Sequence, residues 1–223
     1  MTGADDEAEA RKAARRAKRN LRTAHAKGLM QGILSMLRPG DVVLDCGANV
    51  GDVSEPLAQT GATVHAFEPD PWAFAQLSAR LEPYDNVTLH NAAVGARAGR
   101  ITLHRAANFD DNPKGGSVKS TILTGGRNIE DGTGIEVEIV DLTALLRRMH
   151  ADGGEIAFLK MDIEGAELEV LEAMEAGGLF DLVRLTVAET HEHKFKDLRP
   201  RFKALRSAVG ARYPITRVNL DWI

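Results

Sequence analysis

The chain has 223 residues, 43% of them hydrophobic and 27% charged, which is typical of a soluble globular protein and excludes a disordered one. Its 28 lysine and arginine residues against 32 acidic residues give a formal net charge of −4, which disfavours nucleic-acid binding by the surface as a whole. The single cysteine, Cys46, excludes an intramolecular disulfide and favours a reducing compartment. Because no segment has the apolar character of a signal peptide or a membrane span, the sequence predicts a cytoplasmic protein without membrane association.

Residues 1–40 are predicted to form a charged, helical N-terminal arm. The stretch 5–27 is rich in alanine and places acids before bases, an order that complements a helix dipole. We interpret it as a solvated helix or a frayed arm, whose basic residues either face solvent or contact substrate or phosphate. A second short helix is expected over 29–37, because Pro39 and Gly40 cannot continue it.

Residues 41–223 are predicted to form one α/β domain, since short apolar runs alternate there with amphipathic stretches, as in βα units around a parallel sheet. The expected strands are 42–46, 63–67, 87–90, 100–105, 135–140, 156–161, 182–188 and 215–222. The expected helices are 53–59, 71–81, 142–150 after the cap residue Asp141, 166–176 and 198–208. The stretch 106–134, rich in Gly, Asn, Asp and Ser, is predicted to be a long loop. Its residues Lys119, Ser120 and Thr121 are candidates for a lid over the substrate.

A glycine-containing turn joins the first strand to the following helix. Gly47 and Gly51 stand where the backbone must turn tightly and a ligand must approach closely. Glu68 ends the next strand, the position at which doubly wound folds place a carboxylate on ribose hydroxyls. These features on adjacent strands predict a nucleoside site.

The residue types in this turn favour S-adenosylmethionine over a dinucleotide. Asp45 occupies the first glycine position of the G-x-G-x-x-G pattern, where its charge would repel a diphosphate. The ammonium and sulfonium groups of S-adenosylmethionine are positively charged and therefore favour a nearby carboxylate. After the third predicted strand, Asn91 is placed to form a hydrogen bond with the edge of adenine. The small residues that follow it leave room for this base.

A second group of candidate residues follows two strands of the second half. Asp162 ends a buried strand, while Glu164 and Glu167 suit the N-terminus of the next helix. With a period of two, Glu189, His191 and His193 share one face after the neighbouring strand. We expect a general base here, or a divalent cation with oxygen and nitrogen ligands. The alternative is an exposed polar loop after the strand, and for His193 we favour that alternative.

The chain resembles the FkbM-type methyltransferases, class I enzymes that depend on S-adenosylmethionine. The resemblance covers residues 41–193 and rests on VLDCGANVGD at 43–52, FEPDP at 67–71, NAAVG at 91–95, FLKMDIEGAELEVLEAM at 158–174 and AETH at 188–191. It implies a Rossmann-like fold with a seven-stranded, mostly parallel sheet, helices on both faces and an antiparallel last strand.

The resemblance also implies residue roles and a reaction. Methyl transfer would go to an oxygen of a small-molecule or sugar-containing acceptor by direct in-line displacement. The methionine end would be framed by Asp45, Gly47, Asn49 and Gly51; the ribose would meet Glu68, with Pro69 beside it; and the adenine side would be formed by Asn91, Ala92 and Ala93. Asp162 would stand at the methyl-transfer end.

For the chemistry itself, we expect Glu189 or His191 to act as the base. Asp162 would orient the acceptor or the amine of the cofactor, or share a divalent cation with Glu189. Two other functions stay open at this point. One is an NAD-linked oxidoreductase, and the other is a non-catalytic nucleoside-binding module whose basic arm holds RNA or a protein. A nucleic-acid substrate is disfavoured by the acidic chain and by the absence of an N-P-P-Y-type segment. The sequence leaves the acceptor and the oligomeric state undecided, a homodimer included.

Overall fold

The computed structural model describes residues 3–106, 129–163, 165–192 and 195–222. Its main sheet has six strands in the order β3-β2-β1-β7-β8-β9, and every pair in it is parallel. The strands are β1 (Val42–Cys46), β2 (Thr63–Phe67), β3 (Val87–His90), β7 (Ile156–Met161), β8 (Val183–Ala188) and β9 (Val218–Asn219). The predicted α/β class and parallel sheet are therefore confirmed, and β1, β2, β3 and β7 have the predicted bounds.

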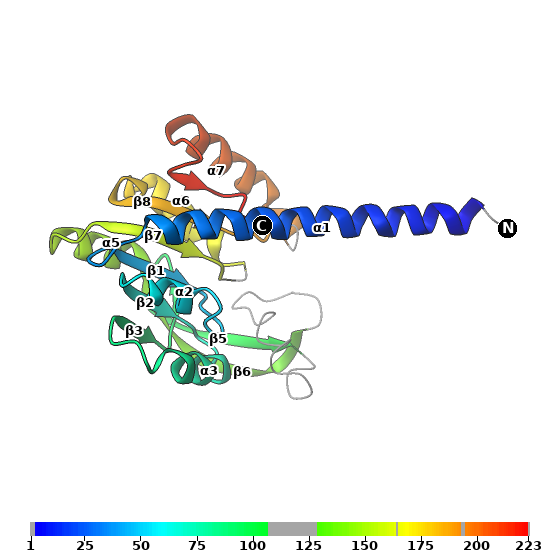
Figure 1. The fold of residues 1–223 in the computed structure, drawn as a ribbon. Coiled ribbons are helices and arrows are strands. Elements are labelled where there is room, and N and C mark those ends of the chain that lie inside the picture. The colour runs from blue at the N-terminus through cyan, green and yellow to red at the C-terminus, as the bar shows by residue number, and fades with distance from the viewer. Residues whose placement is uncertain (1–2, 107–128, 164, 193–194, 223) are drawn as a thin grey trace.

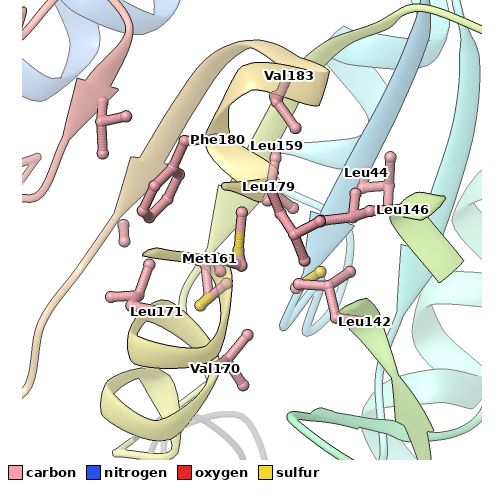
Figure 2. Close-up of a cluster of buried hydrophobic side chains, with 14 of the residues drawn as sticks. Leu44, Leu142, Leu146, Leu159, Met161, Val170, Leu171, Leu179, Phe180 and Val183 are labelled. Carbon is pink, nitrogen blue, oxygen red and sulfur yellow. The ribbon is translucent and has the colours of Figure 1, made fainter. Parts of the chain in front are cut away.

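Helices cover both faces of this sheet because successive strand residues point to opposite sides. In β1, Leu44 and Cys46 belong to one buried cluster and Val43 to the other. The first cluster, shown in part in Figure 2, lies under α5 (Leu142–Ala151), α6 (Glu167–Ala176), α7 (Arg199–Arg212) and the 3-10 helix η1 (Leu179–Leu182). The second lies under α1 (Gly3–Met36), α2 (Ser54–Gln59) and α3 (Pro71–Leu81). A short 3-10 helix, η2 (Lys196–Leu198), precedes α7.

The N-terminal arm is one continuous helix, α1, and not the two helices expected from the sequence. Only its last part is anchored: Ile33 and Leu37 are buried, and Ala26 and Leu34 pack against the same cluster. From Arg11 to Ala24 the side chains are exposed. Figure 1 shows this part of α1 running well past the other elements.

A smaller sheet carries the second departure from the sequence-based expectation. It has the order β4-β6-β5, with β4 (Ala93–Gly95) parallel and β5 (Gly99–Ala106) antiparallel to β6 (Ile129–Asp141). Residues 129–134, expected in a loop, are part of β6. The candidate lid residues Lys119, Ser120 and Thr121 lie outside the described residues.

Two details of the implied topology are wrong for the part of the chain that the structure describes. The main sheet has six strands instead of seven, and the last strand, β9, pairs with β8 in parallel. The physical reason is the connection: α7 forms a helical crossover that returns the chain to the edge from which β8 started. Only an isolated bridge beyond the strands, between Glu189 and Asp221, is antiparallel.

Candidate cofactor and acceptor site

The turn after β1 is built from residues with left-handed backbone. Gly47 has φ of 81°, Asn49 of 49° and Gly51 of 90°, a conformation that favours glycine and, next, asparagine. A Cβ atom at Gly47 would lie 1.8 Å from the carbonyl oxygen of Asp162, so only glycine fits between the two strand ends. The turn is therefore packed directly against the end of β7.

Asp45 lies fully buried beneath this turn. Its Oδ2 accepts a 2.6 Å hydrogen bond from Ser54 Oγ, and its Oδ1 lies 3.0 Å from Lys160 Nζ. The same ammonium donates a 2.6 Å hydrogen bond to the carbonyl of Gly47. Burial alone would lower the pKa of Lys160, but the carboxylates of Asp45 and Asp162 outweigh burial and raise that pKa. Lys160 therefore stays charged and ties β1, β7 and the glycine turn together.

Glu68 stands at the end of β2 with both carboxylate oxygens facing backbone amides. Asn49 N donates to Oε2 and Asp70 N to Oε1, each at 2.8 Å. Burial raises the pKa of Glu68 to about 7, against the lowering effect of these two amides. Asp70, in turn, caps α3 by accepting from Trp72 N and Ala73 N.

The segment after β3 packs against the end of β2, next to Glu68. Asn91 Nδ2 donates to the backbone carbonyls of Glu68 at 2.8 Å and Pro69 at 3.3 Å. Ala92 and Ala93 are buried next to it. The structure thus gathers the residues expected around the nucleoside, with the Asn91 amide holding the end of β2.

On the other side of the turn, three candidate catalytic residues come together. Asp162, Glu189 and His191 each offer a ligand atom, and these atoms lie within 4.8 Å of one another. His191 Nε2 is 3.8 Å from Asp162 Oδ1 and 3.9 Å from Glu189 Oε1. The backbone fixes two of the positions: Asp162 N donates to the Cys46 carbonyl at 3.0 Å, and Glu189 N to the Met161 carbonyl at 2.9 Å.

Glu167 holds the imidazole of His191 from behind. Its Oε1 lies 2.8 Å from His191 Nδ1, and the carboxylate also accepts from Ile163 N at 3.0 Å and Gly165 N at 2.8 Å. Both side chains are buried. Because a carboxylate accepts hydrogen bonds, we assign the proton to Nδ1, which directs the lone pair of Nε2 toward Asp162 and Glu189.

Sequence reasoning missed two of these residues as parts of the site. Lys160 carried a signal, because a lysine inside a fully buried strand needs a charged partner. Glu167 was expected to serve the helix N-terminus. It lies in the first turn of α6 but accepts hydrogen bonds from amides of the preceding loop, and its contact with His191 depends on the fold. Burial of Cys46 raises its thiol pKa, in line with its predicted packing role. Glu164 and His193 lie outside the described residues.

A cleft of about 1020 Å³ lies between the small sheet and α6. Its lining includes Gly95 to Ile101 on one side and Gly165, Ala166 and Leu168 on the other. Gly165 is also the residue whose amide binds Glu167, so the cleft reaches the segment that orients His191. The volume is in the range of small-molecule sites.

Residues 45–213 match the family model described as the methyltransferase FkbM domain. The chain belongs to the FkbM family of methyltransferases. It is 34% identical over 180 residues to the 31-O-demethyl-FK506 methyltransferase FkbM of Streptomyces tacrolimicus, covering 70% of this chain and 67% of that one. It is 30% identical over 202 residues to methyltransferase sdnD of Sordaria araneosa, covering 81% and 76%. It is also 30% identical over 153 residues to 2-O-methyltransferase NoeI of Sinorhizobium fredii, covering 66% and 61%.

As a member of this family, the protein is an S-adenosylmethionine-dependent methyltransferase. The family match favours this function over an NAD-linked oxidoreductase. The residues present fit the cofactor, because a turn that only glycine can form adjoins a buried carboxylate, Glu68, at the end of the neighbouring strand. In the described part of the chain, no helix has the length and apolar character needed to cross a membrane.

Proposed function

We propose that this enzyme methylates a hydroxyl oxygen of a small-molecule or sugar-containing acceptor in the cytoplasm. Two of its relatives carry an oxygen position in their names, 31-O-demethyl-FK506 methyltransferase and 2-O-methyltransferase. The cleft beside α6 has the volume for a small acceptor. The single observation that carries the proposal is the convergence of Asp162, Glu189 and His191 directly beside the glycine turn.

S-adenosylmethionine supplies an electrophilic methyl group on its sulfonium sulfur. In our proposal the turn containing Gly47, Asn49 and Gly51 frames its methionine end. Glu68, with Pro69 beside it, accepts hydrogen bonds from the ribose. The free lone pairs of the Glu68 oxygens suit this role, because each oxygen uses only one for a backbone amide.

Asn91, Ala92 and Ala93 form the adenine side in the same proposal. Ala92 and Ala93 are small and buried, and the Asn91 amide fixes the backbone of Glu68 and Pro69. Asp45 contributes indirectly: its full burial favours a role in holding Lys160, and through Lys160 the carbonyl of Gly47. The residues proposed to surround the nucleoside part of the cofactor therefore come from the ends of β1 and β2 and from the segment after β3.

The acceptor hydroxyl must lose its proton as its oxygen attacks the methyl group. We place this step at the cluster of Asp162, Glu189 and His191, where two carboxylate oxygens and an imidazole nitrogen lie within 4.8 Å of one another. Asp162 lies nearest to the glycine turn, because its carbonyl contacts Gly47. It therefore stands between the cofactor side and the acceptor side.

The first test is binding of S-adenosylhomocysteine and NAD to the purified protein by thermal unfolding. A ligand at 100 times its dissociation constant stabilises the fold by about 2.7 kcal/mol. For a domain of this size that is a rise of roughly 5–11 °C. We expect this rise with S-adenosylhomocysteine and none with NAD; the reverse would overturn the cofactor assignment.

The second test is transfer of a labelled methyl group to a panel of hydroxylated small molecules, with the methylated atom identified in the product. We expect Glu189→Gln and His191→Ala to lower turnover by at least about a hundredfold while S-adenosylhomocysteine still binds. Glu192→Gln is the matched control, since Glu192 is a neighbouring carboxylate that faces Arg206 instead of the cluster. Near-normal turnover in both variants, or methylation of nitrogen only, would contradict the proposal.

A further inference from the structure

The spacing of Asp162, Glu189 and His191 suits a bound cation better than direct contact between them. The separations of 3.8 Å and 3.9 Å from His191 Nε2 to the two carboxylates exceed a hydrogen bond. Ligand atoms about 2.0–2.6 Å from one ion lie roughly 3–5 Å from one another. All three atoms meet this condition, since they fall within 4.8 Å.

A second observation is the state of the Asp162 carboxylate. Its Oδ1 is buried and accepts no hydrogen bond from any described residue. A buried carboxylate oxygen without a donor is costly, by about 1–3 kcal/mol or more. Lys160 Nζ lies 3.9 Å from the other oxygen, Oδ2, and is bound more closely to Asp45. A cation next to Oδ1 would remove this cost.

The third observation is the support behind the imidazole. Metal-binding histidines usually donate their other ring N–H to a carboxylate or carbonyl, which fixes the tautomer and the ring orientation. Glu167 provides such a partner at 2.8 Å from Nδ1, and it is itself fixed by two backbone amides. The Nε2 lone pair therefore points at the two carboxylates without any rearrangement of the ring.

We propose that Asp162, Glu189 and His191 bind one divalent cation, with Glu167 as the positioning residue of His191. Two carboxylate oxygens and one imidazole nitrogen suit Mg²⁺, Mn²⁺ or Zn²⁺. Three protein ligands also leave coordination positions for an acceptor hydroxyl. This inference deepens the proposed function and, for the role of the cation, rests on it.

The cation would take over removal of the acceptor's proton. A hydroxyl bound to it has a lowered pKa and releases its proton to water. The hydroxyl oxygen then forms the new C–O bond while the C–S bond of the sulfonium breaks, and the sulfur leaves as a neutral thioether. His191 and Glu189 act in this arrangement as ligands.

The test is titration of the full-length protein, first stripped with EDTA and dialysed, with Mn²⁺ followed by the EPR signal of the free ion. We expect one site per chain, at least tenfold weaker in Asp162→Asn and Glu189→Gln and unchanged in Glu192→Gln. Glu167→Gln should weaken Mn²⁺ about 10–100-fold, because its loss frees the imidazole. Calorimetric titrations with Mg²⁺ and Zn²⁺ extend the comparison to the other two cations.

Failure of this inference and failure of the proposed function give different results. Binding of S-adenosylhomocysteine in EDTA reports the cofactor site and the integrity of each variant without any cation. If that binding holds while none of the three cations binds below about 1 mM, the cation site is refuted and a metal-free base remains. Binding of a cation that Asp162→Asn and Glu189→Gln leave undiminished would place it elsewhere and refute the site as well.

Discussion

The backbone of Gly47 lies directly against the carbonyl of Asp162, at a distance that leaves no room for a side chain. The two residues directly follow adjacent parallel strands, β1 and β7, and Asp162 N donates back to the Cys46 carbonyl. Because of this contact, we expect the turn proposed to bind the cofactor and Asp162 of the proposed acceptor cluster to move together.

A substitution of Gly47 should therefore disturb both sides at once. In Gly47→Ala, the new methyl group would overlap the Asp162 carbonyl, and φ of 81° adds left-handed strain of about 1–2 kcal/mol. We expect a loss of more than about 2 kcal/mol in unfolding free energy and weaker binding of S-adenosylhomocysteine. Chemical denaturation and calorimetry measure the two effects.

Gly40→Ala is the matched control, because Gly40 has φ of 94° but no atom within 4 Å of an added Cβ. It should show the strain alone, with unchanged ligand affinity. Equal effects of the two substitutions would mean that the contact with Asp162 does not matter.

β1 and β7 were predictable because each is a short, mostly buried run bounded by turn-forming residues. The bounds of β1 and β7 agree with the prediction to the residue, and every residue of β7 is buried. The arm was harder. Gly28 lies between the two segments that we predicted as separate helices, but a single glycine costs only about 1 kcal/mol in a helix. The packing of Ile33 and Leu37 outweighs that cost, so α1 continues through it.

The location of the candidate site residues at strand ends was predictable, but their side-chain contacts were not. The rule that ligands bind at the carboxyl ends of parallel strands selected Glu68, Asp162 and Glu189. Sequence spacing does not show that Lys160 lies beside Asp45, or that Glu167 contacts His191, because each pair joins segments that are distant in the chain. The direction of β9 depended in the same way on the crossover before it.

The buried pair of Asp45 and Lys160 predicts strong coupling between the two residues. Lys160→Met should cost about 3–5 kcal/mol in stability, because it leaves the Asp45 carboxylate buried with Ser54 as its remaining partner. Asp45→Asn should be destabilising for the converse reason. The double variant should lose at least about 1 kcal/mol less than the sum of the two single losses.

Urea unfolding of the four proteins gives this coupling directly, and additive losses would argue against the pair. The pH dependence has a defined sign. Since the pKa of Lys160 is raised in the folded protein, its contribution is present at neutral pH and is lost only as the pH rises through that folded-state pKa.

Glu68 predicts a pH dependence of cofactor binding near neutrality. Its folded-state pKa of about 7, raised mainly by burial, means that the carboxyl group is partly protonated at pH 7. Ribose hydroxyls favour the ionised form, so the dissociation constant of S-adenosylhomocysteine should rise about tenfold from pH 8 to pH 6. Calorimetry in two buffers should also show proton release on binding at pH 6.5.

Glu68→Gln is the comparison for this effect. It should bind the ligand more weakly and lose most of the pH dependence, since glutamine does not titrate. For the stability of the ligand-free protein the sign is opposite to that for ligand binding. Because the pKa of Glu68 is raised in the folded state, its contribution to stability falls as the pH rises from the ordinary pKa of a glutamate toward 7. A flat binding profile in the unaltered protein would place the ribose elsewhere.

Because the first part of α1 is exposed, we predict that the catalytic domain does not need it for stability or for ligand binding. Eight lysine and arginine residues between positions 11 and 27 fall on one half of the helix at about 100° per residue, and none of them is buried. Deleting residues 1–25 removes seven of these eight charges, all but Lys27, and leaves the anchored end from Ala26 to Leu37 intact. We therefore expect the midpoint of thermal unfolding to change by less than about 2 °C and the affinity for S-adenosylhomocysteine to stay the same.

Ile33→Ala in the full chain is the matched control for the anchored end. Ile33 is 5% exposed and packs on the cluster beneath α1 and α2, so its truncation should cost about 2–4 kcal/mol. That corresponds to a fall of roughly 4–16 °C in the unfolding midpoint. A large loss of stability or cofactor affinity on deleting residues 1–25 would instead make the arm part of the catalytic domain. An unchanged midpoint in Ile33→Ala would show that α1 is not anchored where its apolar residues meet the sheet.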